Sequence, residues 1–402
     1  MVWFKGGFKV KWVRLGEILS LEYGDSLPEY KRITGKYPIM GSNGVVGYHN
    51  TFLIRSPAII VGRKGSAGKV NYIDQDCYPI DTTYFVQLKT ECSLKFIYYV
   101  LTNLQLEHLK TGGGVPGLNR EHVYQILIPL PPLKEQHAIA TFLDHKCAKI
   151  VACIAKKTRM LALLKEYKQA LISKITTKGL NPQEHFKPSG VAWLGDIPGH
   201  WGLIPLGRIF KIRDEINKDR AITLILSLVK DIGVLPYSEK GNIGNKAKAD
   251  LSQYQVVRSG DLVLNKMNAV IGSLGVSNYD GLVSPIYLVL FIQNKNLHLM
   301  QYYASLFASK ALQQSLGQYA YGIMKIRESI DFMSFKQMLL PVPPLKEQHA
   351  IAAFLDHRLA KLDTLITKLQ TQIQDLKDYK SALISEAVLG QIPLKAKHAK
   401  IQ

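Results

Sequence analysis

The apolar positions of two long segments follow a seven-residue pattern that predicts a pair of coiled-coil helices. In the second segment, residues 355–383, the spacings between successive seam positions alternate between four and three. This spacing keeps one apolar stripe of the helix facing a partner helix. Subtracting 212 gives a first segment in the same register, with lysine at one shared seam position, Lys168 and Lys380. The predicted seam residues are Leu143, Ile150, Ile154, Leu161, Leu164, Leu171, Leu355, Leu359, Leu362, Ile366, Leu369, Ile373, Leu376 and Leu383.

Both helical segments open with the same phrase. Residues 131–145 read PPLKEQHAIATFLDH and residues 343–357 read PPLKEQHAIAAFLDH, so only Thr141 and Ala353 differ. Two prolines suit the first turn of a helix, and the glutamate that follows favours a helix N-terminus. A repeat distance of 212 in a chain of 402 residues indicates two similar halves, each made of a variable block and a near-constant one.

The seam pattern leaves two packing arrangements open. Two helices with matched seams pack most simply on each other, and they run antiparallel if a two-fold axis relates the halves. Alternatively, each helix packs on its own block. At 1.5 Å per residue, about 45 residues span roughly 65 Å, so a helix pair would hold the two blocks a fixed distance apart.

The two variable blocks share an outline although their sequences differ. Each contains an apolar strand, a basic glycine-containing loop, a Gly-Ser-x-Gly turn at 65–68 or 272–275, and a second strand. A tyrosine pair follows in an apolar, helix-like stretch, at 98–99 and 302–303. We therefore expect one fold with diverged loops, which is what two readers of different sequences need.

The charge balance adds a class of partner. With 51 Lys and Arg against 31 Asp and Glu, the net charge is +20 and the pI is near 9.6. A polyanion is the natural partner, with nucleic acid ahead of membrane; the alternative is a merely basic soluble protein. No apolar run is long enough to span a membrane, and the N-terminus lacks an apolar leader. Four cysteines without metal-ligand spacing predict reduced thiols in a cytosolic protein.

The sequence lacks the motifs of common enzymes. It has no P-loop, no zinc-ligand spacing, no Asn/Asp-Pro-Pro-aromatic signature of amine methyltransferases and no clear nuclease core. The segment GSNGVVG at residues 41–47 does not match the dinucleotide pattern GxGxxG. We interpret the recurrent His137 and His349 as helix-start or partner-surface residues. The chain is therefore predicted to be non-catalytic, with no metal site and no cofactor of its own.

On these residues the chain resembles the specificity subunits of type I restriction-modification systems. The resemblance covers nearly all of the chain and rests on the repeated phrase, on GRKGSAGKVNY and NKMNAVIGSLGVS, and on the connector WLGDIP. It implies an α+β protein with a pseudo-two-fold internal repeat. Two similar globular target recognition domains, separated by an antiparallel two-helix coiled coil, would each read one half of a bipartite double-stranded DNA site.

The resemblance also implies partners and a division of the chain. Two methyltransferase subunits would dock on the coiled coil, and restriction subunits would join that core. S-adenosylmethionine, ATP and magnesium would belong to these partners, and the complex would be cytoplasmic. The expected parts are 1–130, target recognition domain 1; 131–180, helix 1; 181–200, connector; 201–342, target recognition domain 2; 343–392, helix 2; and 393–402, a basic tail.

Candidate DNA contacts are polar and basic residues in glycine-containing loops. Arginine suits guanine, asparagine suits adenine, and about half of such residues are expected to reach only phosphate or sugar. The candidates are Ser42, Asn43, Arg63, Lys64, Ser66, Lys69, Asn119, Asn245, Lys246, Lys266, Asn268, Ser273, Lys325 and Arg327. Two other functions remain open: a scaffold whose recognition domains are inactive, and a stand-alone DNA-modifying enzyme.

Overall fold

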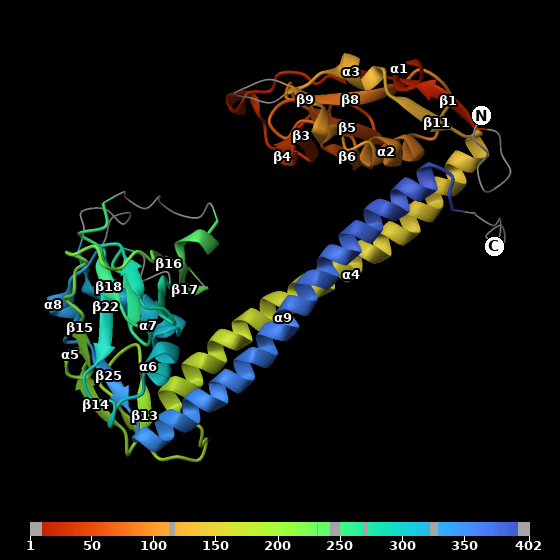
Figure 1. Cartoon of the computed structure of the whole chain (residues 1–402). Coiled ribbons are helices and arrows are strands. Elements are labelled where there is room, and N and C mark those ends of the chain that lie inside the picture. Colours follow the sequence, from red (N-terminus) through yellow and green to blue (C-terminus); the bar gives the residue numbers. More distant parts are fainter. Residues whose placement is uncertain are drawn as a thin grey trace. The chain divides into compact units, whose positions relative to one another are not determined.

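The chain forms two compact units, each with its own sheet and core (Figure 1). The computed structural model describes residues 10–111, 117–230, 232–241, 250–267, 272–321 and 329–392. Unit 1 comprises Met1–Thr158 and Thr371–Gln402, and unit 2 comprises Arg159–Gln370. Each unit therefore takes part of both long helices.

A four-stranded antiparallel sheet with the same strand order lies at the centre of each unit. The order is β2-β8-β5-β6 in unit 1 and β15-β22-β19-β20 in unit 2. The unit 1 strands are β2 (Leu19–Tyr23), β5 (Ala58–Gly62), β6 (Val70–Ile73) and β8 (Thr83–Leu88). The unit 2 strands are β15 (Phe210–Ile212), β19 (Leu262–Asn265), β20 (Leu274–Val276) and β22 (Tyr287–Ile292). The predicted likeness of the two blocks is confirmed by this shared order.

The short elements around each sheet also correspond. Each sheet is preceded by a strand paired with the strand before the Pro-Pro phrase, and each carries a helix with the tyrosine pair. In unit 1 these elements are β1 (Lys11–Arg14), α1 (Leu15–Ile18), α2 (Leu94–Asn103), η2 (Leu106–Leu109), β9 (Lys110–Thr111), β10 (Gly117–Leu118), α3 (Arg120–Tyr124) and β11 (Leu127–Leu130). In unit 2 they are β14 (Gly202–Pro205), α5 (Leu206–Ile209), α6 (Met300–Phe307), α7 (Lys310–Ser315), η5 (Leu316–Tyr319), β23 (Ala320–Tyr321), β24 (Ser329–Ile330), α8 (Phe332–Phe335) and β25 (Leu339–Val342).

The two units differ most in the segments inserted into the sheet. Unit 1 has a sheet of order β4-β3-β7, whereas unit 2 has the pairs β16-β17 and β18-β21. The unit 1 insert contains η1 (Glu29–Lys31), β3 (Tyr37–Gly41), β4 (Gly44–His49) and β7 (Tyr78–Pro79). The unit 2 insert contains β16 (Leu226–Val229), β17 (Gly233–Pro236), η3 (Tyr237–Glu239), β18 (Gln255–Val257) and β21 (Gly281–Val283). A further hairpin, β12 (Phe186–Pro188) with β13 (Asp196–Pro198), lies in the expected connector.

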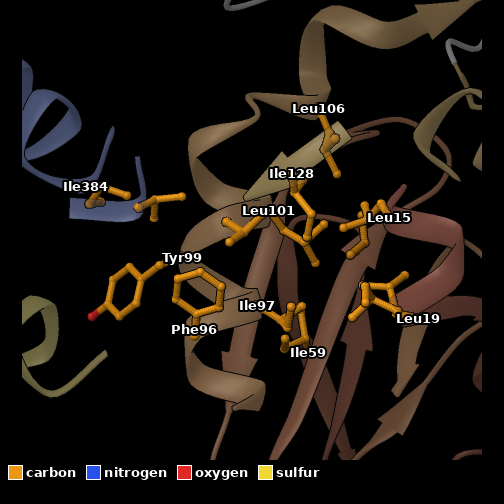
Figure 2. Close-up of a cluster of buried hydrophobic side chains, with 14 of the residues drawn as sticks. Leu15, Leu19, Ile59, Phe96, Ile97, Tyr99, Leu101, Leu106, Ile128 and Ile384 are labelled. Carbon is orange, nitrogen blue, oxygen red and sulfur yellow. The ribbon is translucent and has the colours of Figure 1, made fainter. Parts of the chain in front are cut away.

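The core of unit 1 joins the sheet to α2 and to both long helices. Figure 2 shows apolar side chains of the sheet facing those of α2, with Ile384 of the last helix at the edge of the cluster. The period-two pattern of β2 buries Leu19 and Leu21 on one face. Ile97 and Leu101 of α2 are four residues apart and bury the same helical face.

The predicted coiled coil is formed by α4 (Leu133–Lys178) and α9 (Leu345–Val388). In unit 1, Lys157 Nζ of α4 donates to Gln372 Oε1 of α9 at 2.7 Å. In unit 2, Lys168 of α4 forms an ion pair with Asp363 of α9. From the first contact to the second, the position in α4 rises from 157 to 168 while the position in α9 falls from 372 to 363, which makes the pairing antiparallel.

Both packing arrangements that the sequence left open occur together. The first turns of α4 are part of the unit 1 core, which also includes Leu383 and Ile384 of α9. The first turns of α9 are part of the unit 2 core, which also includes Ile175 of α4. Each helix therefore packs on its own block and on the partner helix. The fourteen predicted seam residues are all buried or half-buried.

The repeated phrase fastens each long helix to its block through a buried glutamine. Gln136 Oε1 accepts from the backbone N–H of Ser93, the cap of α2, and its Nε2 donates to Pro131 O, both at 2.9 Å. Gln348 does the same at the start of α6, accepting from Leu299 N–H at 2.8 Å. A single side-chain amide thus fixes the helix that carries the tyrosine pair to the start of the coil.

Candidate nucleic-acid interface

Unit 1 brings together loops that are far apart in the sequence. Lys69, after the turn that follows β5, donates from Nζ to the backbone oxygen and to Oδ1 of Asn43, both at 2.8 Å. Asn43 lies in the turn between β3 and β4. Lys64 forms a β-bridge with Gly117 of β10, and Leu118 N–H donates to Arg63 O at 2.9 Å. The loops at residues 42–43, 63–69 and 117–120 therefore form one surface, which we call the unit 1 loop surface.

Glycine makes the close approach of these loops possible. A side chain at Gly62 would lie 2.9 Å from Ser42 O and 2.2 Å from Ser66 O, closer than atoms can pack. Gly68 has a φ of +87° and would place a side chain 2.4 Å from Glu107 N, a conformation and a spacing that only glycine tolerates. These glycines thus shape the surface and leave binding to their neighbours.

Two residues that sequence reasoning missed complete the unit 1 loop surface. Tyr23, the last residue of β2, is 48% exposed. The guanidinium groups of Arg63 and Arg120 both lie over its ring, each 4.9 Å from the centroid. Arg120 ends the glycine-rich sequence GGGVPGLNR at residues 112–120, so its type and position could have marked it as a candidate. Nothing in the local sequence marked Tyr23.

The electrostatics of this surface are dominated by cations. Burial and, to a smaller extent, the neighbouring Tyr23 raise the pKa of Tyr84 to about 12, against the opposing effect of Arg63 and Arg120. Tyr84 donates from its hydroxyl to Leu118 O at 3.2 Å, so it is neutral and structural. The arginines remain as the charges that a ligand would meet.

The other unit 1 candidates have different environments. Lys64 is exposed, while Ser66 and Lys69 are half-buried. Asn119 caps α3, because its Oδ1 accepts from Glu121 N–H at 2.9 Å. Only its amide nitrogen is left for a ligand, which agrees with the expectation that some candidates cap turns.

The unit 2 candidates are less complete. Lys266 is half-buried after β19, and its backbone oxygen accepts from Ile330 N–H of β24 at 3.2 Å. Ser273 is 5% exposed, and its backbone oxygen accepts from Asn265 N–H at 3.0 Å in the tight connection to β20. The Ser273 side chain is therefore largely covered by the protein, and its contact with DNA stays a prediction. The candidates outside the described residues are Asn245, Lys246, Asn268, Lys325 and Arg327.

A catalytic or metal centre is not visible in the described parts of the chain. No group of three or more His, Cys, Asp and Glu among those residues could hold a metal ion. The four cysteines are free, with Cys77 and Cys147 buried, and burial raises the pKa of the Cys77 thiol to about 11, with a smaller effect of Asp76. Among the same residues, no helix is long and apolar enough to cross a bilayer.

Comparison with known proteins adds a family. The family model described as "Type I restriction modification DNA specificity domain" matches twice, at residues 9–159 and 198–375. A putative type I restriction enzyme specificity subunit of Haemophilus influenzae is 23% identical over 376 residues, covering 89% of each chain. The specificity subunit of the type I restriction enzyme EcoDI of Escherichia coli is 20% identical over 96% of this chain and 90% of its own length.

Solved structures agree on the fold. A chain from a study of complex assembly and conformational transition of a type I restriction-modification system matches with a TM-score of 0.67 at 17% identity, covering 95% of this chain and 99% of that one. The HsdS subunit of Thermoanaerobacter tengcongensis matches with a TM-score of 0.50 at 18% identity, covering 98% and 99%. Both likenesses extend over the whole chain.

Proposed function

The chain belongs to the type I restriction modification DNA specificity family, with two copies of its domain, and on this premise we propose that its two units read the two halves of one bipartite DNA site. It serves as the specificity subunit of a type I restriction-modification complex. Unit 1 reads one half-site with its loop surface. Unit 2 reads the other with the corresponding loops after β19 and beside β24.

The observation that carries this proposal is one sheet built twice with different inserts. Both units have the same strand order, yet β3, β4 and β7 in unit 1 give way to β16, β17, β18 and β21 in unit 2. A shared scaffold with different loops presents different side chains to DNA from the same position. Two unlike half-sites are the target such a pair of surfaces fits.

The remaining parts of the proposal concern partners. We infer that the α4–α9 coil sets the unread spacer and docks two methyltransferase subunits, through which restriction subunits join. S-adenosylmethionine, ATP and magnesium serve those partners, and this chain uses no cofactor of its own. The net charge of +20 suits a subunit that binds double-stranded DNA, and the complex acts in the cytoplasm, where that DNA lies.

The chain itself is proposed to be non-catalytic. The polar side chains that the structure describes on the unit 1 loop surface are arginines, lysines, Tyr23 and small serine and asparagine groups, without an acid–base pair or a nucleophile beside a base. S-adenosylmethionine binding by the isolated chain, measured by calorimetry, would contradict this and favour a stand-alone modifying enzyme.

Modification mapping tests the whole proposal. The chain is expressed with its cognate methyltransferase subunit in a methylation-free host, and the DNA is sequenced for modified adenines. We expect a bipartite motif with a fixed unread gap. A stable complex that leaves the DNA unmodified would refute DNA reading and favour a recognition-inactive scaffold.

A further inference from the structure

The arrangement of Tyr23, Arg63 and Arg120 is unusual for its charge balance. Two like charges lie over one exposed ring, and within the described residues no carboxylate pairs with Arg63. Arg120 has only a 3.7 Å contact from Nε to Glu121, whose side chain is largely exposed, and such surface pairs contribute little. Each cation–ring contact contributes about 0.5–1 kcal/mol at an exposed site. The ring therefore holds two cations, of which Arg63 has no acidic partner among the described residues and Arg120 has only a weak one.

The two arginines differ in how their donors are used. Arg120 Nη1 donates to Leu21 O of β2 at 3.2 Å, which fixes its guanidinium against the sheet. In the described structure, the guanidinium of Arg63 donates to no protein group, although its backbone N–H and C=O hold Thr82 and Leu118. Arg63 therefore combines a fixed backbone and a ring-supported side chain with a free set of donors.

A planar, fixed guanidinium with free donors fits one base edge best. The O6 and N7 atoms of guanine accept two parallel hydrogen bonds from arginine in the major groove. A phosphate also accepts a bidentate pair of hydrogen bonds from arginine, so the variants below must separate the two partners: loss of a phosphate contact weakens binding to all sequences, whereas loss of a guanine contact changes one base pair. The Tyr23 ring fixes the orientation of the guanidinium, which matters for a hydrogen-bonded fork, and does not change its charge.

We propose that Arg63 reads a guanine in the half-site of unit 1, and that Tyr23 and Arg120 are positioning residues for its guanidinium. This inference rests on the proposed function and adds to it the identity of one nucleobase in the DNA target. Tyr23 supplies the face on which the guanidinium lies. Arg120 shares that ring and, held to Leu21 O, limits the positions that the Arg63 guanidinium can take.

Among the described residues, unit 2 has no counterpart of this cluster, so the guanine that Arg63 reads belongs to the half-site of unit 1. Lys266 follows β19 where Arg63 follows β5. Phe332 opens α8 after its cap Asp331, where Arg120 opens α3 after Asn119. The strand corresponding to β2 ends in Ile212 rather than tyrosine. Substitutions in the unit 1 cluster should therefore leave recognition of the half-site read by unit 2 unchanged.

The experiment is modification mapping of the full chain with its methyltransferase subunit, on a library in which every position of the motif is varied. Arg63→Lys keeps the charge and removes the fork. We expect discrimination at one G·C pair to fall about 5- to 150-fold, with all other positions unchanged. Tyr23→Phe should keep the discrimination, whereas Tyr23→Leu and Arg120→Ala should reduce it at the same base pair.

Controls separate the possible results. Lys64→Ala, at the exposed neighbour of Arg63, should weaken modification evenly over all sequences, as loss of a phosphate contact does. Thermal unfolding and methyltransferase binding are measured for every variant, and the half-site of unit 1 is identified by exchanging residues 1–130. The proposal is overturned if that half-site contains no guanine, or if Arg63→Lys weakens all sequences evenly or changes nothing. In each of those cases a bipartite motif from the wild-type chain still supports the proposed function. If the wild-type chain gives no bipartite motif, both the role of Arg63 and the proposed function are refuted.

Discussion

At the scale of single residues, the buried glutamines explain why the repeated phrase is strict at its start. Gln136 and Gln348 are almost inaccessible, and each satisfies backbone groups at the junction between the coil and its block. A buried polar group left without its partner costs about 1–3 kcal/mol. No apolar residue of similar size could replace the amide, because the partner N–H and C=O groups would stay unpaired.

Gln136→Ala should therefore lower the free energy of unfolding of unit 1 by about 1–3 kcal/mol. The substitution leaves Ser93 N–H and Pro131 O without their partner. Urea denaturation of the wild-type and variant chains measures the difference. His137→Ala is the matched control, because His137 is the exposed neighbour in the same phrase and its loss should stay within about 0.5 kcal/mol. Equal effects of the two substitutions would contradict a fastening role for Gln136.

His298 gives unit 2 a stability that depends on pH. The imidazole is buried, with Nδ1 3.0 Å from the Tyr303 hydroxyl, and burial lowers the pKa of His298. Unfolded His298 titrates near 6.5, so below about pH 6.5 the unfolded state binds more protons than the folded state. The free energy of unfolding should thus fall as pH falls through this range, by at most about 1.4 kcal/mol per pH unit.

Denaturation midpoints measured between pH 7.5 and 5, conditions chosen to cross about 6.5, test this dependence. His298→Asn retains a group that can bond to Tyr303 and removes the titration, so its midpoint should vary less with pH. His137→Asn, at an exposed histidine, should keep the wild-type slope. If His298→Asn and the wild-type chain show the same slope, another group is responsible.

At the scale of elements, the coil was predictable because its signal is local and redundant. A 4,3 spacing sustained over many turns fixes which face is apolar, whatever the blocks do. The joint packing of each helix on block and partner was not predictable, since it depends on α2 and α6 presenting the right surfaces. Pattern alone also missed α3 and α8, which are single turns held by the caps Asn119 and Asp331.

The candidate site was predictable in composition but not in geometry. Glycine-rich basic loops marked the candidate DNA contacts, and Arg63 was among them. The partnership of Arg63 with Tyr23 and Arg120 required β2, β5 and α3 to meet, over about a hundred residues of sequence. The burial of Ser273 was not predictable for the same reason: it follows from the tight connection between β19 and β20, which a turn motif does not reveal.

A matched change in helix length tests whether the coil sets the spacer. Seven residues centred on Lys157 are removed from α4 together with the seven centred on its partner Gln372 in α9, so that the seam register is preserved. Each removal shortens its helix by about 10 Å, equivalent to roughly three base pairs of duplex. We expect modification mapping to give a different spacer, or loss of modification with the methyltransferase complex intact.

Removing seven residues from α4 alone is the control for that experiment. It shifts the facing residues relative to α9 and should reduce thermal stability, whereas the matched deletion should reduce it less. A spacer unchanged by the matched deletion would show that the coil is not a ruler.

At the scale of the whole molecule, modularity follows from where the cores are. Each sheet, its tyrosine-bearing helix and its Pro-Pro strand share a core with one end of the coil. Side chains that define the unit 1 loop surface are held by residues of the same unit, including Leu21, Leu118 and Tyr84.

Exchanging residues 1–130 for the matching block of another specificity subunit should therefore change one half-site and leave the other intact. The boundary lies after β11, so β1 and its partner strand move together, while Gln136 remains to fasten the new block. Mapping of modified adenines would give a hybrid motif with the original spacer. A change in both half-sites would mean that recognition by one unit depends on the other. It would refute the prediction that each unit reads its half-site independently.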